Sequence, residues 1–171
     1  MTSMIHHTHT PATPQRVVGI GDMAVAAEQG LIVTHGLGSC VALVIYDPTV
    51  RVGGMLHFQL PDSSMDRGRA EQSPALFGDT GTLHLLKGAE ALGASRRRCR
   101  VHLIGGAQVI SSMANAEIGK RNHQSVRKAL WKLGMLITGE DIGGSASRWV
   151  GIDLATGSVR VRSQNKETVL P

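Results

Sequence analysis

Short apolar runs separated by glycine and polar turns dominate the first third of the chain. Residues 31–34 are rich in β-branched side chains and predict a strand. A glycine-rich turn follows at residues 35–39, and the continuous apolar run at residues 40–46 predicts a strand that is buried on both faces. Residues 52–60 predict an antiparallel partner for that strand, because only a short turn separates the two.

The next segment alternates between polar stretches and helical periodicity. Residues 61–79 are polar and predict a loop, and residues 80–92 predict a helix that ends at Gly93. The apolar stripe of this helix contains Leu83, Leu86 and Ala89. Residues 100–104 then predict a strand.

A second helix is predicted to begin near Asn122, a residue type that commonly caps helix N-termini, and to end at Gly134. Its apolar stripe consists of Val126, Ala129, Leu130 and Leu133.

Three further strands are predicted in the last part of the chain, at residues 135–137, 149–154 and 159–162, the last two forming a hairpin. Hairpin-connected strands with only two main helices favour an α+β fold with a mixed, mainly antiparallel sheet. The chain's 171 residues suit one compact domain. We place it at residues 16–163, between a disordered N-terminal tail (1–15) and a C-terminal tail (164–171).

Composition narrows the range of partners. The formal net charge is +5, yet charged residues make up only 18% and aromatic residues only 3% of the chain. Nucleic-acid binding needs basic clusters and often aromatic side chains for base stacking, so we predict no nucleic-acid partner. A mildly basic surface equally suits an acidic protein partner.

The chain has two cysteines, Cys40 and Cys99, and no CxxC pair that would indicate a metal site. We therefore predict no disulfide framework, no metal and no cofactor. The longest apolar run, residues 40–46, falls far short of the roughly 20 residues that span a bilayer. With no signal-peptide pattern, we predict no membrane insertion and a cytoplasmic location, where a thiol stays reduced.

Cys40 is the first candidate for chemistry, because it follows the glycine-rich turn and opens an apolar strand. Gly38 and Ser39 would let a substrate approach closely, and free N–H groups at Ser39 and Cys40 would stabilise an oxyanion. A free cysteine before an apolar run is, however, more often a small buried hydrophobic residue.

A thiol needs a base near neutral pH, and His57 on the predicted partner strand is the best placed. Thr34, at the end of the preceding strand, is a candidate for orienting the imidazole. The alternatives are that His57 is a hydrogen-bonded core residue and that Thr34 serves only strand propensity. His35 is a second candidate base, although adjacent strand residues point to opposite faces.

The basic run at residues 96–98, next to Cys99, has two interpretations. It forms either a solvated helix end or a docking surface for an acidic partner, and the first is the commoner use of such a run. Cys99 itself has no neighbouring base or glycine turn.

Several ordered motifs together resemble the CheD family. These motifs are Thr34-His35-Gly36-Leu37-Gly38-Ser39-Cys40, Gly53-Gly54-Met55-Leu56-His57-Phe58-Gln59-Leu60-Pro61, Gly105-Gly106-Ala107, Ile118-Gly119-Lys120-Arg121-Asn122 and Asp141-Ile142-Gly143-Gly144 with Arg148. The resemblance covers about residues 17–162, nearly the whole chain.

The resemblance implies deamidation of glutamine side chains on methyl-accepting chemoreceptors, with release of ammonia. It also implies that Cys40, His57 and Thr34 are the catalytic residues, and that a CheC-type phosphatase is a partner. The fold it implies is a three-layer α/β sandwich similar to the catalytic domain of the cytotoxic necrotizing factor toxins. Two alternatives keep the family but change the role: a receptor glutamate methylesterase that uses the same site, or a non-catalytic adaptor.

Overall fold

Two five-stranded sheets form the framework of the protein, whose computed structural model describes residues 13–109 and 113–171. Sheet A has the order β1-β3-β8-β9-β10, and sheet B the order β2-β5-β4-β6-β7. The strands of sheet A are β1 (Gln15–Val17), β3 (Leu31–Leu37), β8 (Arg148–Asp153), β9 (Val159–Ser163) and β10 (Lys166–Leu170). The strands of sheet B are β2 (Asp22–Ala27), β4 (Val41–Asp47), β5 (Val52–Phe58), β6 (Arg100–Gly105) and β7 (Gly139–Ile142).

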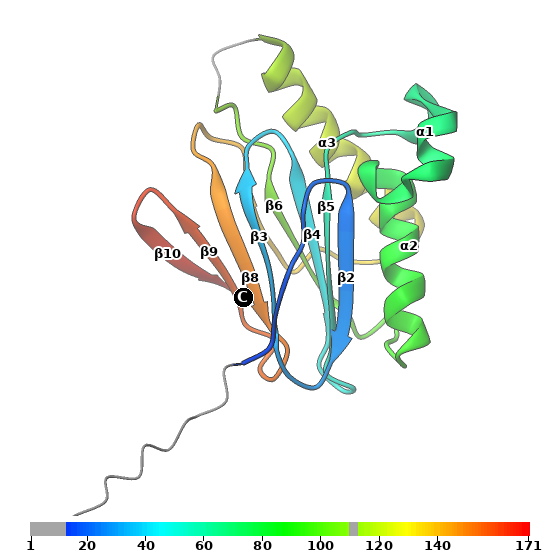
Figure 1. Ribbon diagram of the computed structural model, residues 1–171, viewed down its shortest axis with the longest axis vertical. Coiled ribbons are helices and arrows are strands. Elements are labelled where there is room, and N and C mark those ends of the chain that lie inside the picture. The colour runs from blue at the N-terminus through cyan, green and yellow to red at the C-terminus, as the bar shows by residue number, and fades with distance from the viewer. Residues whose placement is uncertain (1–12, 110–112) are drawn as a thin grey trace, which may run out of the picture.

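The helices gather on one side of the molecule, over sheet B (Figure 1). The helices are α1 (Arg67–Gln72), α2 (Gly78–Ala91) and α3 (Met113–Lys132), with the short 3-10 turns η1 (Ser63–Met65) and η2 (Pro74–Leu76). The order sheet A, sheet B, helices makes three layers, and most strand pairs are antiparallel. The predicted α+β class with a mainly antiparallel, mixed sheet is therefore confirmed.

Strand β4 lies at the centre of the packing, because both of its faces are buried. Ala42 and Val44 face sheet A within one hydrophobic core, whereas Leu43 and Ile45 face the helices within a second core. A strand covered on both sides reads as a continuous apolar run rather than an alternating one. The sequence pattern at residues 40–46 correctly predicts this strand.

Helix α3 begins nine residues earlier than the sequence pattern predicts, so Asn122 is an interior residue and not an N-cap. Its inward face carries Val126 and Leu130, as expected, but also Gly119 and Asn122, which are buried too. A glycine and an asparagine interrupt the apolar periodicity, which is why the pattern placed the helix start too late.

Several other predictions need correction. Residues 61–79 contain two 3-10 turns and α1. Residues 135–137 do not pair as a strand: Met135 and Ile137 join the core that contains Val126 and Leu130 of α3, and Leu136 is exposed. The seventh strand instead begins at Gly139. Leu86 and Ala89 of α2 are buried as predicted, but Leu83 is exposed and Leu85 is buried instead.

The chain ends also differ from expectation. Where a tail is predicted after residue 163, the structure has β10, which pairs with β9 along its length. Strand β1 begins at Gln15, and residues 1–12 of the predicted N-terminal tail lie outside the described residues. Among the helices of the described segments, none has the length and hydropathy that a membrane span requires.

Candidate functional site

Cys40 lies in the turn between β3 and β4, directly before the first residue of β4. Its side chain is 8% exposed, and it lines a surface pocket of about 260 Å³. The other residues that line this pocket are Gly36, Gly38, Ser39, Ala107, Val109 and Ser147. The thiol is therefore largely buried but can be reached from solvent by a group as small as a side-chain amide.

The main chain around Cys40 is anchored through its carbonyl groups. The backbone N–H of Ala107 donates to the oxygen of Gly38 (2.7 Å), and that of Gly106 donates to the oxygen of Cys40 (2.8 Å). No other described residue accepts a hydrogen bond from the N–H groups of Ser39 or Cys40. Both residues line the pocket, and within the described part of the chain their N–H groups have no acceptor, as an oxyanion site requires.

His57 lies on the same face of sheet B as Cys40. It pairs directly with Ala42 across the β4–β5 ladder, and Cys40 precedes Ala42 by two residues. Because strand side chains alternate between faces, Cys40 and Ala42 share one face, and both belong to the core between the sheets. Diagonal neighbours of this kind have Cα atoms about 7–8 Å apart, within reach of long or aromatic side chains.

The imidazole of His57 is 1% exposed and held by sheet A. Its Nδ1 lies 2.8 Å from Oγ1 of Thr34, and that hydroxyl also lies 2.7 Å from the carbonyl oxygen of Val18. A carbonyl oxygen only accepts, so the single hydroxyl proton of Thr34 goes to Val18, and Nδ1 of His57 must donate to Thr34. Nε2 then carries the lone pair, and it has no hydrogen-bond partner among the described residues.

Burial sets the charge of both groups. It lowers the pKa of His57 from 6.5 to about 4, so the imidazole is neutral at physiological pH. Burial also raises the pKa of the Cys40 thiol, and the residue's own backbone N–H partly offsets this rise. At rest the two groups are therefore a thiol and a neutral imidazole, whose Nε2 has no hydrogen-bond partner among the described residues.

Thr34 and His57 are hydrogen-bonded to each other between the two sheets, and Cys40 belongs to the same core. The catalytic roles of the three residues stay a prediction. The other candidates lie elsewhere. His35 is exposed, its ring lies 6.5 Å from that of Trp149, and it does not line the pocket that contains Cys40. Burial, followed by the charge of Asp47, raises the pKa of Cys99 to about 11.

The basic run at residues 96–98 is partly occupied by local contacts. Arg98 pairs with the buried carboxylate of Asp47 at 2.7 Å, and Arg96 pairs with Glu90 at 2.8 Å. The first pair joins the segment after α2 to the end of β4, and the second joins it to α2 itself, which favours the structural interpretation of the run.

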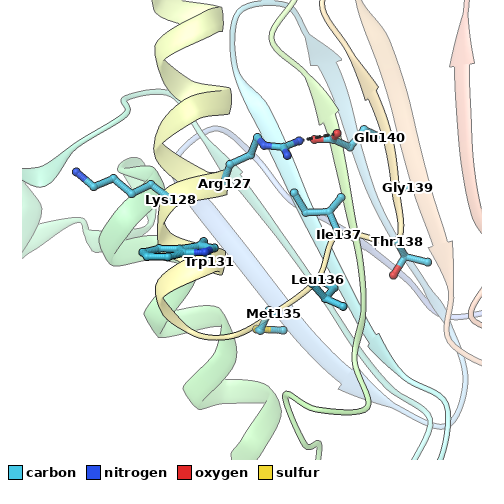
Figure 2. A pocket seen from close by; sticks show the side chains of 9 residues that line it. All are labelled: Arg127, Lys128, Trp131, Met135, Leu136, Ile137, Thr138, Gly139 and Glu140. Atoms are coloured by element: carbon cyan, nitrogen blue, oxygen red, sulfur yellow. Dashed lines mark hydrogen bonds and ion pairs between the residues drawn. The ribbon is translucent and has the colours of Figure 1, made fainter.

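A larger hollow of about 790 Å³ lies elsewhere, between the end of α3 and the start of β7 (Figure 2). Its wall includes Trp131 and Leu136, which are 80% and 86% exposed, and the ion pair between Arg127 and Glu140 at 2.9 Å. It contains no cysteine or histidine side chain, so size alone does not identify the reactive site. Within the described residues, no group of three or more His, Cys, Asp or Glu side chains is arranged to hold a metal.

One contact at the site is not predicted from the sequence. The side-chain amide of Asn122 on α3 donates to the backbone oxygens of Ser39 (3.0 Å) and Gln59 (2.9 Å). The available signal was a polar residue on the otherwise apolar helix face that continues through Val126 and Leu130.

Comparisons with known proteins agree with the motifs. The family model described as CheD chemotactic sensory transduction matches residues 59–163. A protein of Solibacter usitatus named probable chemoreceptor glutamine deamidase CheD is 41% identical over 157 residues, covering 91% of this chain and 93% of the relative. A Pyrococcus abyssi protein of the same name is 45% identical over 147 residues, covering 85% of this chain and 89% of the relative.

A third relative, from Thermococcus kodakarensis and with the same name, is 43% identical over 155 residues, covering 90% of this chain and 95% of the relative. The match to the family model starts just after His57, but the pairwise matches extend further. The alignment with the Solibacter usitatus protein covers 91% of this chain and therefore includes positions 34 to 57.

Proposed function

Because this chain belongs to the CheD family, we propose that it is a chemoreceptor glutamine deamidase that uses Cys40 as nucleophile and His57 as general base. The relatives are named for that activity, and this chain aligns with nearly their whole length. The observation that supports the chemistry is the partnerless Nε2 of the neutral His57, on the same sheet face as a thiol that opens into a pocket.

The reaction begins when Nε2 of His57 accepts the thiol proton of Cys40 and the sulfur attacks the side-chain amide carbon of a glutamine. The carbonyl oxygen becomes an oxyanion that accepts hydrogen bonds from the N–H groups of Ser39 and Cys40. The imidazolium returns its proton to the amide nitrogen, the C–N bond breaks, and ammonia leaves behind a thioester.

Water completes the cycle. His57 removes a proton from the water as its oxygen attacks the thioester carbon, the C–S bond breaks, and the proton returns to sulfur. The products are a glutamate side chain and the original thiol. Thr34 keeps Nδ1 of His57 protonated throughout, so that Nε2 is always the nitrogen that exchanges protons.

The substrate we assign is the cytoplasmic part of a methyl-accepting chemoreceptor, and we therefore propose a cytoplasmic location for the enzyme. A CheC-type phosphatase partner and a likeness to the cytotoxic necrotizing factor domain remain predictions of the family resemblance. No cofactor enters this reaction scheme, because the thiol, the imidazole and water supply every atom exchanged.

The test is intact-mass analysis of a purified chemoreceptor cytoplasmic fragment incubated with the enzyme. Each converted glutamine adds about one dalton and releases one ammonia. We expect Cys40→Ala to reduce ammonia release on the order of 10³-fold or more. Cys99→Ala removes the other thiol and serves as the matched control, with activity near that of the wild type.

Conversion by Cys40→Ala at the wild-type rate would exclude the proposed nucleophile. Methanol released from a methylated receptor, with no ammonia from the unmethylated one, would instead identify a methylesterase that uses the same site. If the wild type releases neither, the adaptor interpretation remains.

A further inference from the structure

Asn122 connects the turn that carries the thiol to the strand that carries the imidazole. It lies inside α3 and is 0% exposed. Its amide nitrogen is 3.0 Å from the backbone oxygen of Ser39 and 2.9 Å from that of Gln59. Both partners are carbonyl oxygens, which only accept, so the orientation of the amide follows from chemistry, and both N–H bonds are used on the main chain.

The contact with Ser39 fixes the peptide group that Ser39 shares with Cys40. In a planar trans peptide the C=O and N–H bonds point in opposite directions, and no described peptide bond is cis. Holding the oxygen of Ser39 toward α3 therefore aims the N–H of Cys40 the other way. That N–H lies beside the sulfur, where it lowers the thiol pKa. Hydrogen bonding at one end of a peptide group also polarises the other end and strengthens it as a donor.

The contact with Gln59 fixes the end of β5. Gln59 follows the last residue of β5 and stands two residues after His57. The backbone N–H of Gln59 donates to the oxygen of Leu76 at 3.1 Å, and Asn122 supplies the donor for the backbone oxygen of Gln59. One side chain thus holds the segments beside the nucleophile and beside the base at a fixed separation.

Gly119, one turn earlier on α3, lets the helix approach closely enough for this contact. A Cβ atom at Gly119 would lie 2.7 Å from the backbone oxygen of Gly106, closer than real Cβ contacts occur. Gly106 in turn donates its N–H to the oxygen of Cys40. The helix is therefore seated directly on the loop that anchors the nucleophile.

From these contacts we propose that Asn122 is a positioning residue for the reaction, which aligns the Cys40 oxyanion donor and sets the distance between thiol and base. The proposal rests on the proposed function for its activity measurements. The Oδ1 atom of Asn122 is buried and has no hydrogen-bond partner, which costs free energy. Stability alone therefore does not explain an asparagine at this position.

The first test compares Asn122→Ala with Tyr46→Phe. Tyr46 is also buried and its hydroxyl donates to the backbone oxygen of Leu154 at 3.0 Å, so Tyr46→Phe likewise removes a buried side-chain to backbone hydrogen bond, on the inner face of β4 but outside the thiol turn. We expect Asn122→Ala to lower kcat about 10- to 100-fold, with KM changed by less than about threefold. Tyr46→Phe should leave both constants near those of the wild type.

A second measurement does not depend on deamidation. The pH dependence of Cys40 alkylation by iodoacetamide, read on the Cys40 peptide to exclude Cys99, reports the thiol pKa. We expect this pKa to rise in Asn122→Ala, because the N–H of Cys40 is no longer held in position beside the sulfur, and to stay unchanged in Tyr46→Phe. The comparison of thiol pKa values still tests the position of Asn122 relative to Cys40 even if the wild type releases no ammonia.

Asn122→Asp covers the case in which the alanine variant does not fold. The carboxylate has the same shape but no donor, whereas the carboxylic acid regains one, so kcat relative to wild type should rise as pH falls. Circular dichroism at each pH verifies that the variant is folded. A kcat and a thiol pKa in folded Asn122→Ala that match those of Tyr46→Phe would overturn the proposal. A flat activity ratio for Asn122→Asp across pH would also overturn it.

Discussion

The hydroxyl of Thr34 and Nδ1 of His57 lie 2.8 Å apart, and the two residues belong to different sheets. Thr34 is on β3 of sheet A and His57 is on β5 of sheet B, so the hydrogen bond crosses the core. The hydroxyl of Thr34 donates its proton to the oxygen of Val18, so it can only accept from Nδ1 of His57. Nε2 is therefore the imidazole nitrogen that is free to accept a proton. The packing of the two sheets therefore sets the tautomer of the base.

This relationship predicts that Thr34→Val lowers kcat for ammonia release by about 10²-fold, because Nδ1 loses its acceptor and the tautomer is no longer fixed. Valine has nearly the same shape, so the core stays filled. Thr34→Ser keeps the hydroxyl and should stay within a few-fold of wild type. Equal rates for the two variants would show that the hydroxyl has no part in catalysis.

The lowered pKa of His57 predicts an unusual pH–rate profile. The base is active when neutral, and its pKa is about 4 rather than 6.5, so kcat/KM of the free enzyme should hold a plateau through neutral pH and fall only near pH 4. Burial also raises the pKa of Cys40, which extends the plateau on the alkaline side. A steady-state profile of ammonia release measures this, and an acid limb centred near 6.5 would contradict it.

The same pKa predicts a pH dependence of stability. An imidazole with a lowered folded-state pKa binds its proton more readily in the unfolded chain, so the free energy of unfolding should fall as pH drops from 6.5 toward 4. The full difference amounts to about 3 kcal/mol. Urea denaturation of wild type and His57→Asn at pH 7 and pH 5 isolates this term, because the other titrating groups are common to both. Parallel losses in the two proteins would argue against the shift.

Gly119→Ala is predicted to destabilise the protein by about 1–3 kcal/mol and to lower its activity, because the new Cβ would push α3 away from Gly106. Gly88→Ala, near the C-terminal end of α2, is the control. Its Cβ would meet only the side chain of Val25 at 3.2 Å, which can adjust, and alanine is the better helix former by about 1 kcal/mol. Thermal unfolding and ammonia release should show a lower melting temperature and a lower rate for Gly119→Ala than for Gly88→Ala. Similar values for both variants would show that the close approach of α3 to Gly106 is not needed.

The positions of Thr34 and His57 could be predicted from the sequence because each lies on a strand with a strong local pattern, and Cys40 directly precedes such a strand. The β4–β5 pair has a short connection and apolar residues throughout, which fixes the pairing that places His57 across from Ala42. The partner of Thr34 could not be predicted in this way. The packing of sheet A onto sheet B depends on contacts between residues far apart in the chain, and a single sequence does not specify their register.

Asn122 escaped sequence reasoning for a different physical reason. Asparagine is common at helix N-termini and uncommon in buried helix interiors, so local propensity favours the wrong interpretation. Tertiary contacts override that preference here, because two otherwise unpaired carbonyl oxygens require a donor. The end of the chain shows the same limit in another form. Strand β10 is largely exposed and lacks the alternation that marks buried strands.

The near-complete burial of His57, next to a thiol that opens to the surface, has a consequence for chemical probing. Histidine-acylating reagents such as diethyl pyrocarbonate should modify the exposed rings of His35 and His84 and leave the enzyme active. An irreversible inhibitor must instead enter the pocket of about 260 Å³ that Cys40 and Gly38 line, and bond to the sulfur. The selectivity of such an inhibitor then depends on the size of its electrophilic group, since the buried imidazole cannot be modified from solvent.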